Sequence, residues 1–209
     1  MKKVLLLLAD GYESYEASVF IDVIGWNLID GDKTTRLFTC GLRKELTTSF
    51  GQKMIVDYVV DEIRISDFDA LAIPGGFEEY DFYSDAYSEP FLDIIRKFNA
   101  QNKIIASICV AALALGKSGI LKGKRATTYN KKSIRQELLR SYGAIVVDKP
   151  VVRDGTILTC WNPSAAIQVA FALLESLTDR KNTLKALMEA APKNLYYSQH
   201  VEGNGKAHT

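Results

Sequence analysis

The stretch Lys103–Leu121, KIIASICVAALALGKSGIL, decides the fold that this sequence predicts. Residues 104–106 are typical of a short buried strand, and the apolar run after them is typical of a helix, which Gly116 and Gly119 bring to an end. Cys109 lies at the joint between the two. A residue at such a sharp strand-to-helix turn presents its side chain at the carboxyl edge of the sheet. The stretch therefore predicts a nucleophile elbow with Cys109 as the nucleophile.

Two features of the elbow favour a reactive thiol. Ser107 and Ala111, two positions on either side of Cys109, are small and allow the chain segments to approach closely. The turn also places Cys109 at a helix N-terminus, which lowers a cysteine pKa from about 8.5 to roughly 3.5–7.5. We therefore expect an exposed thiolate of low pKa. The alternative is a buried cysteine that packs as a small hydrophobic residue.

The chain on both sides of the elbow alternates between strands and helices. Apolar or alternating runs predict strands at 4–8, 36–39, 45–49, 54–60, 70–73, 145–152 and 156–159. Helical spacing predicts helices at about 14–28, 88–100, 131–142, 163–175 and 181–190. This alternation predicts an α/β fold in which a mostly parallel sheet lies between layers of helices. Functional sites in such sheets lie outside the carboxyl ends of the strands.

The composition predicts one globular domain with few classes of partner. The chain has 209 residues, and 26 basic and 25 acidic side chains leave a net charge of +1. Without a basic run, neither nucleic acid nor an anionic membrane is an expected partner. We expect the domain to cover residues 1–191, with a loosely held tail at 192–209.

Neither a targeting segment nor a disulfide framework is expected. The apolar run after the two N-terminal lysines is short and ends at Asp10, so it predicts a first strand rather than a signal peptide. No stretch approaches the roughly 20 apolar residues that a membrane helix needs. The three cysteines, at positions 40, 109 and 160, form no disulfide framework, so we expect a cytoplasmic protein.

Glu16 is the first residue expected to meet Cys109. It lies in the first turn of the first helix and shares a face with Phe20, Val23 and Ile24, so it points towards the sheet. A carboxyl group against apolar surface is pushed towards its neutral form, which can donate a hydrogen bond to a thiolate. The alternative is a carboxylate that complements the helix dipole, a role we assign to Glu13.

The glycines after strand 70–73 are the second expected part of the site. Gly75 and Gly76 let the backbone come close to a ligand, and either N–H can join the Val110 N–H to form an oxyanion hole. The alternative is a tight turn without catalytic meaning. Cys40 and Cys160 also end strands, but without C-x-x-C spacing we expect structural thiols, and neither a metal nor a cofactor.

These segments together resemble the ThiJ/PfpI superfamily, which includes the Parkinson-disease-associated stress protein and intracellular protease-like proteins. The resemblance extends from Lys3 to about Leu187, in LADGYESYEASVFIDV (8–23), DALAIPGG (69–76), IIASICVAALAL (104–115) and ILTCWNPSAAIQVAFALLE (157–175). It implies a flavodoxin-like three-layer sandwich, commonly a homodimer. The family nucleophile corresponds to Cys109, its acidic partner to Glu16 and its glycine loop to Gly75 and Gly76.

The sequence departs from the family where a histidine is common. Protease-like members have a histidine directly after the cysteine, at the position of Val110, and many others have one where Tyr129 stands. A tyrosine, with an ordinary pKa of about 10, is a poor general base. A peptidase is therefore not expected. The resemblance implies that Tyr129 and Trp161 narrow the opening at Cys109, which favours a small substrate.

Three functions are compatible with these residues. The first is a stress or detoxification protein, an enzyme of the glyoxalase or deglycase kind or a redox sensor, whose Cys109 reacts with small electrophiles such as carbonyls or peroxide. The second is a glutamine amidotransferase-like hydrolase, because Gln199-His200-Val201-Glu202 resembles a late His/Glu pair that completes a cysteine triad. The third is a non-catalytic domain that binds a small molecule.

Overall fold

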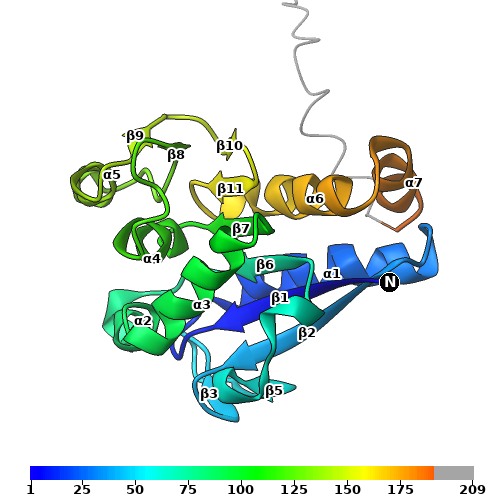
Figure 1. Ribbon diagram of the computed structural model, residues 1–209, viewed down its shortest axis with the longest axis horizontal. Helices are drawn as coiled ribbons and strands as arrows, with labels where there is room; N and C mark the ends of the chain where they lie inside the picture. Colours follow the sequence, from blue (N-terminus) through cyan, green and yellow to red (C-terminus); the bar gives the residue numbers. More distant parts are fainter. Residues whose placement is uncertain (191–209) are drawn as a thin grey trace, which may run out of the picture.

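The computed structural model describes residues 1–190, which fold around one central sheet (Figure 1). Its strands are β1 (Lys2–Leu8), β2 (Thr35–Gly41), β5 (Tyr58–Val59), β6 (Ala70–Ile73), β7 (Ile104–Ile108), β10 (Val151–Asp154) and β11 (Ile157–Cys160). The sheet has seven strands in the order β10-β11-β7-β6-β1-β2-β5. Only β10 and β11 pair in the antiparallel direction; every other pair is parallel.

The strand order confirms the flavodoxin-like fold. Taken in chain order, the five strands β2-β1-β6-β7-β11 are arranged as 2-1-3-4-5, which is the flavodoxin-like order. Residues 4–8 of β1 are fully buried because β1 lies inside the sheet and is covered on both faces. In this arrangement the order reverses between β1 and β6, and the carboxyl ends at that point form a crevice for ligands.

Two groups of helices flank the sheet and complete a three-layer sandwich. The helices are α1 (Ser14–Ile29), α2 (Phe82–Ala86), α3 (Glu89–Ala100), α4 (Ala111–Lys117), α5 (Ser133–Ser141), α6 (Ala166–Leu177) and α7 (Arg180–Ala190). Helices α1, α6 and α7 pack against one another, whereas α3 packs against α2 and α4, and α4 against α5. Figure 1 shows these two groups on different sides of the strands.

Two of the predicted strands are wrong in extent. The run 54–60 is divided into β4 (Lys53–Ile55), which forms a hairpin with β3 (Glu45–Thr47), and β5 in the main sheet. Asp57 interrupts it, because its carboxylate accepts the Thr39 N–H at 2.8 Å. The run 145–152 is divided into β9 (Ile145–Val146), paired with β8 (Arg125–Ala126), and β10. Pro150, which has no N–H, lies in the gap.

Within residues 1–190, none of the helices combines the length and the apolar character that a membrane span requires. The expected tail at 192–209 lies outside the described residues, as do His200 and Glu202 of the amidotransferase alternative. The expected homodimer and the cytoplasmic location stay predictions.

Candidate functional site

Three neighbouring strands bring the predicted site residues to one edge of the sheet. Strands β1, β6 and β7 are adjacent, and each ends at the same edge. Glu16 lies in the first turn of α1, the helix that follows β1; Gly75 follows β6, and Cys109 follows β7. The three residues therefore meet beside the point where the strand order reverses.

Cys109 has the backbone conformation of a nucleophile elbow. Its φ is 58°, in the left-handed region, which costs a non-glycine residue about 1–2 kcal/mol. Contacts on both sides hold this conformation: the Cys109 N–H donates to the Cys160 carbonyl at 2.8 Å, and the Thr128 hydroxyl donates to the Cys109 carbonyl at 2.9 Å. The strain is therefore maintained by β11 and by the loop after β8, and it turns the sulfur towards the crevice.

Glu16 is almost completely buried beside the thiol. Its Oε2 accepts the Gly75 N–H at 2.7 Å, and its carboxyl group is close enough to the Cys109 thiol for each group to shift the pKa of the other. Burial raises the pKa of Glu16 to about 8, and the nearby Glu13 carboxyl contributes in the same direction. Glu16 therefore carries its proton at neutral pH and is a hydrogen-bond donor next to the sulfur.

Gly75 permits this close contact. A Cβ at this position would lie 2.9 Å from Glu16 Oε2, 3.1 Å from Cys109 Cβ and 3.1 Å from the Ile108 carbonyl. Its N–H is bonded to Glu16, so the expected use of the Gly75 N–H in an oxyanion hole needs correction. Gly75 positions the carboxyl group, and Gly76 and Val110 remain as the candidate oxyanion donors.

The thiol is less exposed than the sequence predicts. Cys109 is only 8% exposed, and burial raises its pKa, as does the adjacent Glu16 carboxyl. The backbone N–H of Val110, next to the sulfur, lowers the pKa of Cys109 and so acts in the opposite direction. The expected low pKa at a helix N-terminus is therefore not what this environment favours. The Glu16 carboxyl group, however, raises the pKa of Cys109 by charge repulsion only while Glu16 itself is ionised.

A pocket of about 160 Å³ opens onto the sulfur. It is lined by Gly76, Phe77, Glu78, Glu79, Tyr83, Cys109, Val110, Tyr129, Lys132 and Arg135. The structure thus brings Tyr129, Val110 and Gly76 to Cys109, as the sequence predicts, whereas Trp161 is not among the lining residues. Sequence reasoning missed Tyr83 and Arg135, because they come from α2 and α5 and only the folded chain places them near Cys109.

The other two thiols lie outside this pocket. Cys40 and Cys160 are buried and free, and burial raises the pKa of each to about 12. Neither lines the pocket at Cys109. In the described part of the chain, no group of three or more His, Cys, Asp or Glu side chains is arranged to hold a metal ion.

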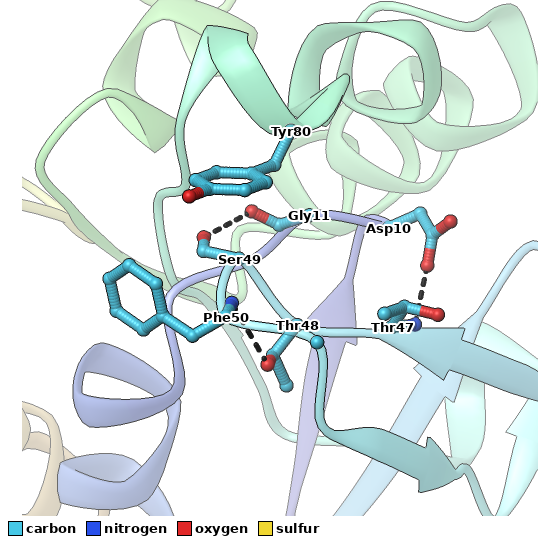
Figure 2. A pocket seen from close by; sticks show the side chains of 8 residues that line it. Asp10, Gly11, Thr47, Thr48, Ser49, Phe50 and Tyr80 are labelled. Carbon is cyan, nitrogen blue, oxygen red and sulfur yellow. Dashed lines mark hydrogen bonds between the residues drawn. The ribbon is translucent and has the colours of Figure 1, made fainter.

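A larger hollow of about 550 Å³ lies between the turn at Asp10 and Gly11, residues 47–51 and Tyr80 (Figure 2). Its polar groups bond to one another: the Ser49 hydroxyl donates to the Gly11 carbonyl at 2.7 Å, and Asp10 accepts the Thr47 N–H at 2.6 Å. No thiol lines it. The chemistry that the sequence predicts is therefore assigned to the smaller pocket.

Comparisons with known protein sequences show which proteins this chain is similar to. The model of the DJ-1/PfpI family matches residues 2–176. The chain is 31% identical to protein DJ-1 homolog A of Arabidopsis thaliana over 84% of this chain, and 36% identical to isonitrile hydratase of Pseudomonas putida over 59%. These matches span only 43% and 53% of the two relatives.

A solved structure has the same fold over nearly the whole chain. The crystal structure of Drosophila melanogaster DJ-1beta superposes with a TM-score of 0.77 at 26% identity, covering 93% of this chain and 97% of that one. Since the family model covers most of the sequence and the fold agrees throughout, this chain belongs to the DJ-1/PfpI family.

Proposed function

We propose that this chain is a cysteine-dependent protein that acts on small electrophiles, with Cys109 as the nucleophile and protonated Glu16 as its hydrogen-bonding partner. The observation that carries the proposal is the contact between the Cys109 thiol and a buried carboxyl group of raised pKa. With a carbonyl substrate, the Cys109 S–H adds across the C=O bond. A carbon–sulfur bond forms, and the proton goes to the carbonyl oxygen.

The two groups act as one titrating unit. When two ionisable groups interact strongly, the first proton lost belongs to the pair rather than to either residue. With one proton left, the pair can hold the negative charge on sulfur, facing the Val110 N–H, and the proton on Glu16. This form is the nucleophile, and it does not require a histidine.

The size of the pocket supports a small substrate. Pockets for drug-sized ligands have volumes of about 300–1,000 Å³, whereas the space at Cys109 is about 160 Å³. Relatives carry the names isonitrile hydratase, deglycase and putative cysteine protease. The first two reactions suit a thiol that attacks a small electrophilic carbon, and a peptide does not suit the volume.

The test is the rate of alkylation of Cys109 by iodoacetamide between pH 5 and 10, followed by mass spectrometry. For the wild type we expect an inflection at or below about pH 8, where the pair loses its first proton. In Glu16→Gln the inflection moves upward, because the buried thiol then titrates without a carboxyl partner. Glu175→Gln, which removes an exposed carboxyl on α6, keeps the wild-type profile.

Cys40 and Cys160 provide an internal control, since thiols with a pKa of about 12 stay unlabelled in the folded protein. A folded protein whose Cys109 does not react, or a pH profile that Glu16→Gln leaves unchanged, would contradict the proposal. Either result would favour a non-catalytic binding domain.

A further inference from the structure

The pocket that opens onto Cys109 is also lined by two paired charges: a guanidinium that is largely buried and a carboxylate that is largely exposed. Arg135 of α5 and Glu78 form an ion pair, with Nη2 and Oε2 2.6 Å apart. The Arg135 side chain is only 18% exposed, whereas the Glu78 side chain is 66% exposed. Both line the pocket, as do the exposed Glu79 and Lys132 at its rim. The deepest charge that a bound molecule meets is therefore positive.

Tyr83 adds a hydrogen-bond donor beside this cation. The Arg135 guanidinium lies over the Tyr83 ring, 5.3 Å from its centroid. The Tyr83 hydroxyl is buried and has no hydrogen-bond partner among residues 1–190. Burial raises the pKa of Tyr83, so the hydroxyl keeps its proton. A buried polar group without a partner is destabilising, and a ligand oxygen that accepts the Tyr83 proton would remove this cost.

We propose that this pocket selects electrophiles that carry a carboxylate, which Arg135 and Tyr83 bind while the electrophilic carbon faces Cys109. The inference rests on the proposed thiol chemistry and names its substrate class, small 2-oxo acids or related carbonyl acids. Arginine suits a carboxylate because its planar fork donates two parallel hydrogen bonds. A bound carboxylate can take the place of Glu78, whose side chain is 66% exposed and can turn to solvent, so Arg135 keeps an anionic partner throughout.

Two alkylating agents of nearly the same shape test the selection. Iodoacetate carries a carboxylate and iodoacetamide a neutral amide; with both, the sulfur forms a bond to carbon and iodide leaves with its electron pair. The measured quantity is the alkylation rate of Cys109 with iodoacetate divided by its rate with iodoacetamide. Dividing this ratio by the same ratio for the free thiol 2-mercaptoethanol removes the intrinsic difference between the two agents and gives the normalised ratio. We expect a normalised ratio of about 10, since a charge-assisted hydrogen bond contributes about 1.5–3 kcal/mol and 1.4 kcal/mol is tenfold.

Single substitutions assign the preference to its residues. In Arg135→Gln the normalised ratio falls to about 1, and in Tyr83→Phe, which keeps the ring under Arg135, it falls about threefold, as expected for one neutral hydrogen bond. Arg140→Gln removes the same charge from an exposed position on the same helix and keeps the wild-type ratio. Because the chain has a net charge of only +1, long-range attraction does not produce the preference.

The outcomes separate the two proposals. If neither agent labels Cys109, the proposed thiol function fails. If both agents label it with a normalised ratio near 1, or if Arg135→Gln leaves a high ratio unchanged, the thiol function stands and the carboxylate site is overturned. The iodoacetamide rate of each variant shows whether the thiol itself is intact, so a misfolded variant is not mistaken for loss of selection.

Discussion

Gly75 couples the positions of Glu16 and Cys109. A methyl group at this residue would lie 2.9 Å from Glu16 Oε2 and 3.1 Å from Cys109 Cβ, so the two side chains must separate to accommodate it. We expect Gly75→Ala to lower the alkylation rate of Cys109 about tenfold, which corresponds to a loss of about 1.4 kcal/mol from their hydrogen bond.

The matched control for this substitution is Gly25→Ala. A Cβ at Gly25, inside α1, would meet no atom within 4 Å. Alanine there stabilises the helix by about 0.5–1 kcal/mol and leaves the reactivity of Cys109 unchanged. Urea unfolding and iodoacetamide labelling of both variants measure the two effects. A Gly75→Ala variant as reactive as Gly25→Ala would show that close packing at Gly75 is not needed.

At the scale of single residues, the sequence locates those parts of the site that follow directly from a strand end. Cys109, Glu16 and Gly75 each come shortly after a strand, and parallel strands end at one edge. The sequence does not reveal which way the Gly75 N–H points, because that depends on how Glu16 packs. It also does not show that Cys109 is buried, because the covering residues come from distant segments.

The elbow is an element whose stability depends on one backbone angle. At a φ of 58°, glycine has no Cβ to strain, whereas alanine retains the unfavourable contact. An alanine-to-glycine change usually destabilises by about 0.5–1 kcal/mol. At this position we expect the reverse: Cys109→Gly is up to about 1 kcal/mol more stable than Cys109→Ala.

Chemical denaturation of the two variants measures this difference. The matched control is Ala112→Gly, three residues further along the chain and inside α4. There the change from alanine to glycine lowers the stability of the protein, because the residue has helical backbone angles. If Cys109→Ala proved the more stable of the two variants, the elbow would not be strained.

The long elements are predictable, and the short ones depend on tertiary contacts. Strands β1, β6 and β7 and helices α1 and α3 follow from unbroken apolar runs or helical periodicity, which are visible in the sequence itself. Strands β8 and β9 contain two residues each and exist only because they pair with one another. Helix α2 has five residues and begins after Asp81, whose φ is 60°. No periodic pattern is long enough to indicate it.

At the scale of the whole molecule, the buried carboxyl of Glu16 connects the site to the stability of the fold. Its pKa rises from 4.5 to about 8 when the chain folds, so between these values the folded protein binds a proton that the unfolded chain does not. Stability contributed by this proton is present below pH 4.5 and is lost as the pH rises towards 8. The same proton that serves the thiol is thus a source of destabilisation at alkaline pH.

Glu16→Gln removes this dependence while keeping the shape of the side chain. In the wild type, Glu16 lowers the free energy of unfolding by about 1.4 kcal/mol per pH unit within this window, about 5 kcal/mol in total. We expect urea unfolding at pH 5.5 and 8.5 to show a smaller decrease for Glu16→Gln than for the wild type, and Glu175→Gln to follow the wild type. Equal decreases in all three proteins would mean that Glu16 is already ionised in the fold, and the hydrogen bond it is expected to donate to Cys109 would then have no proton.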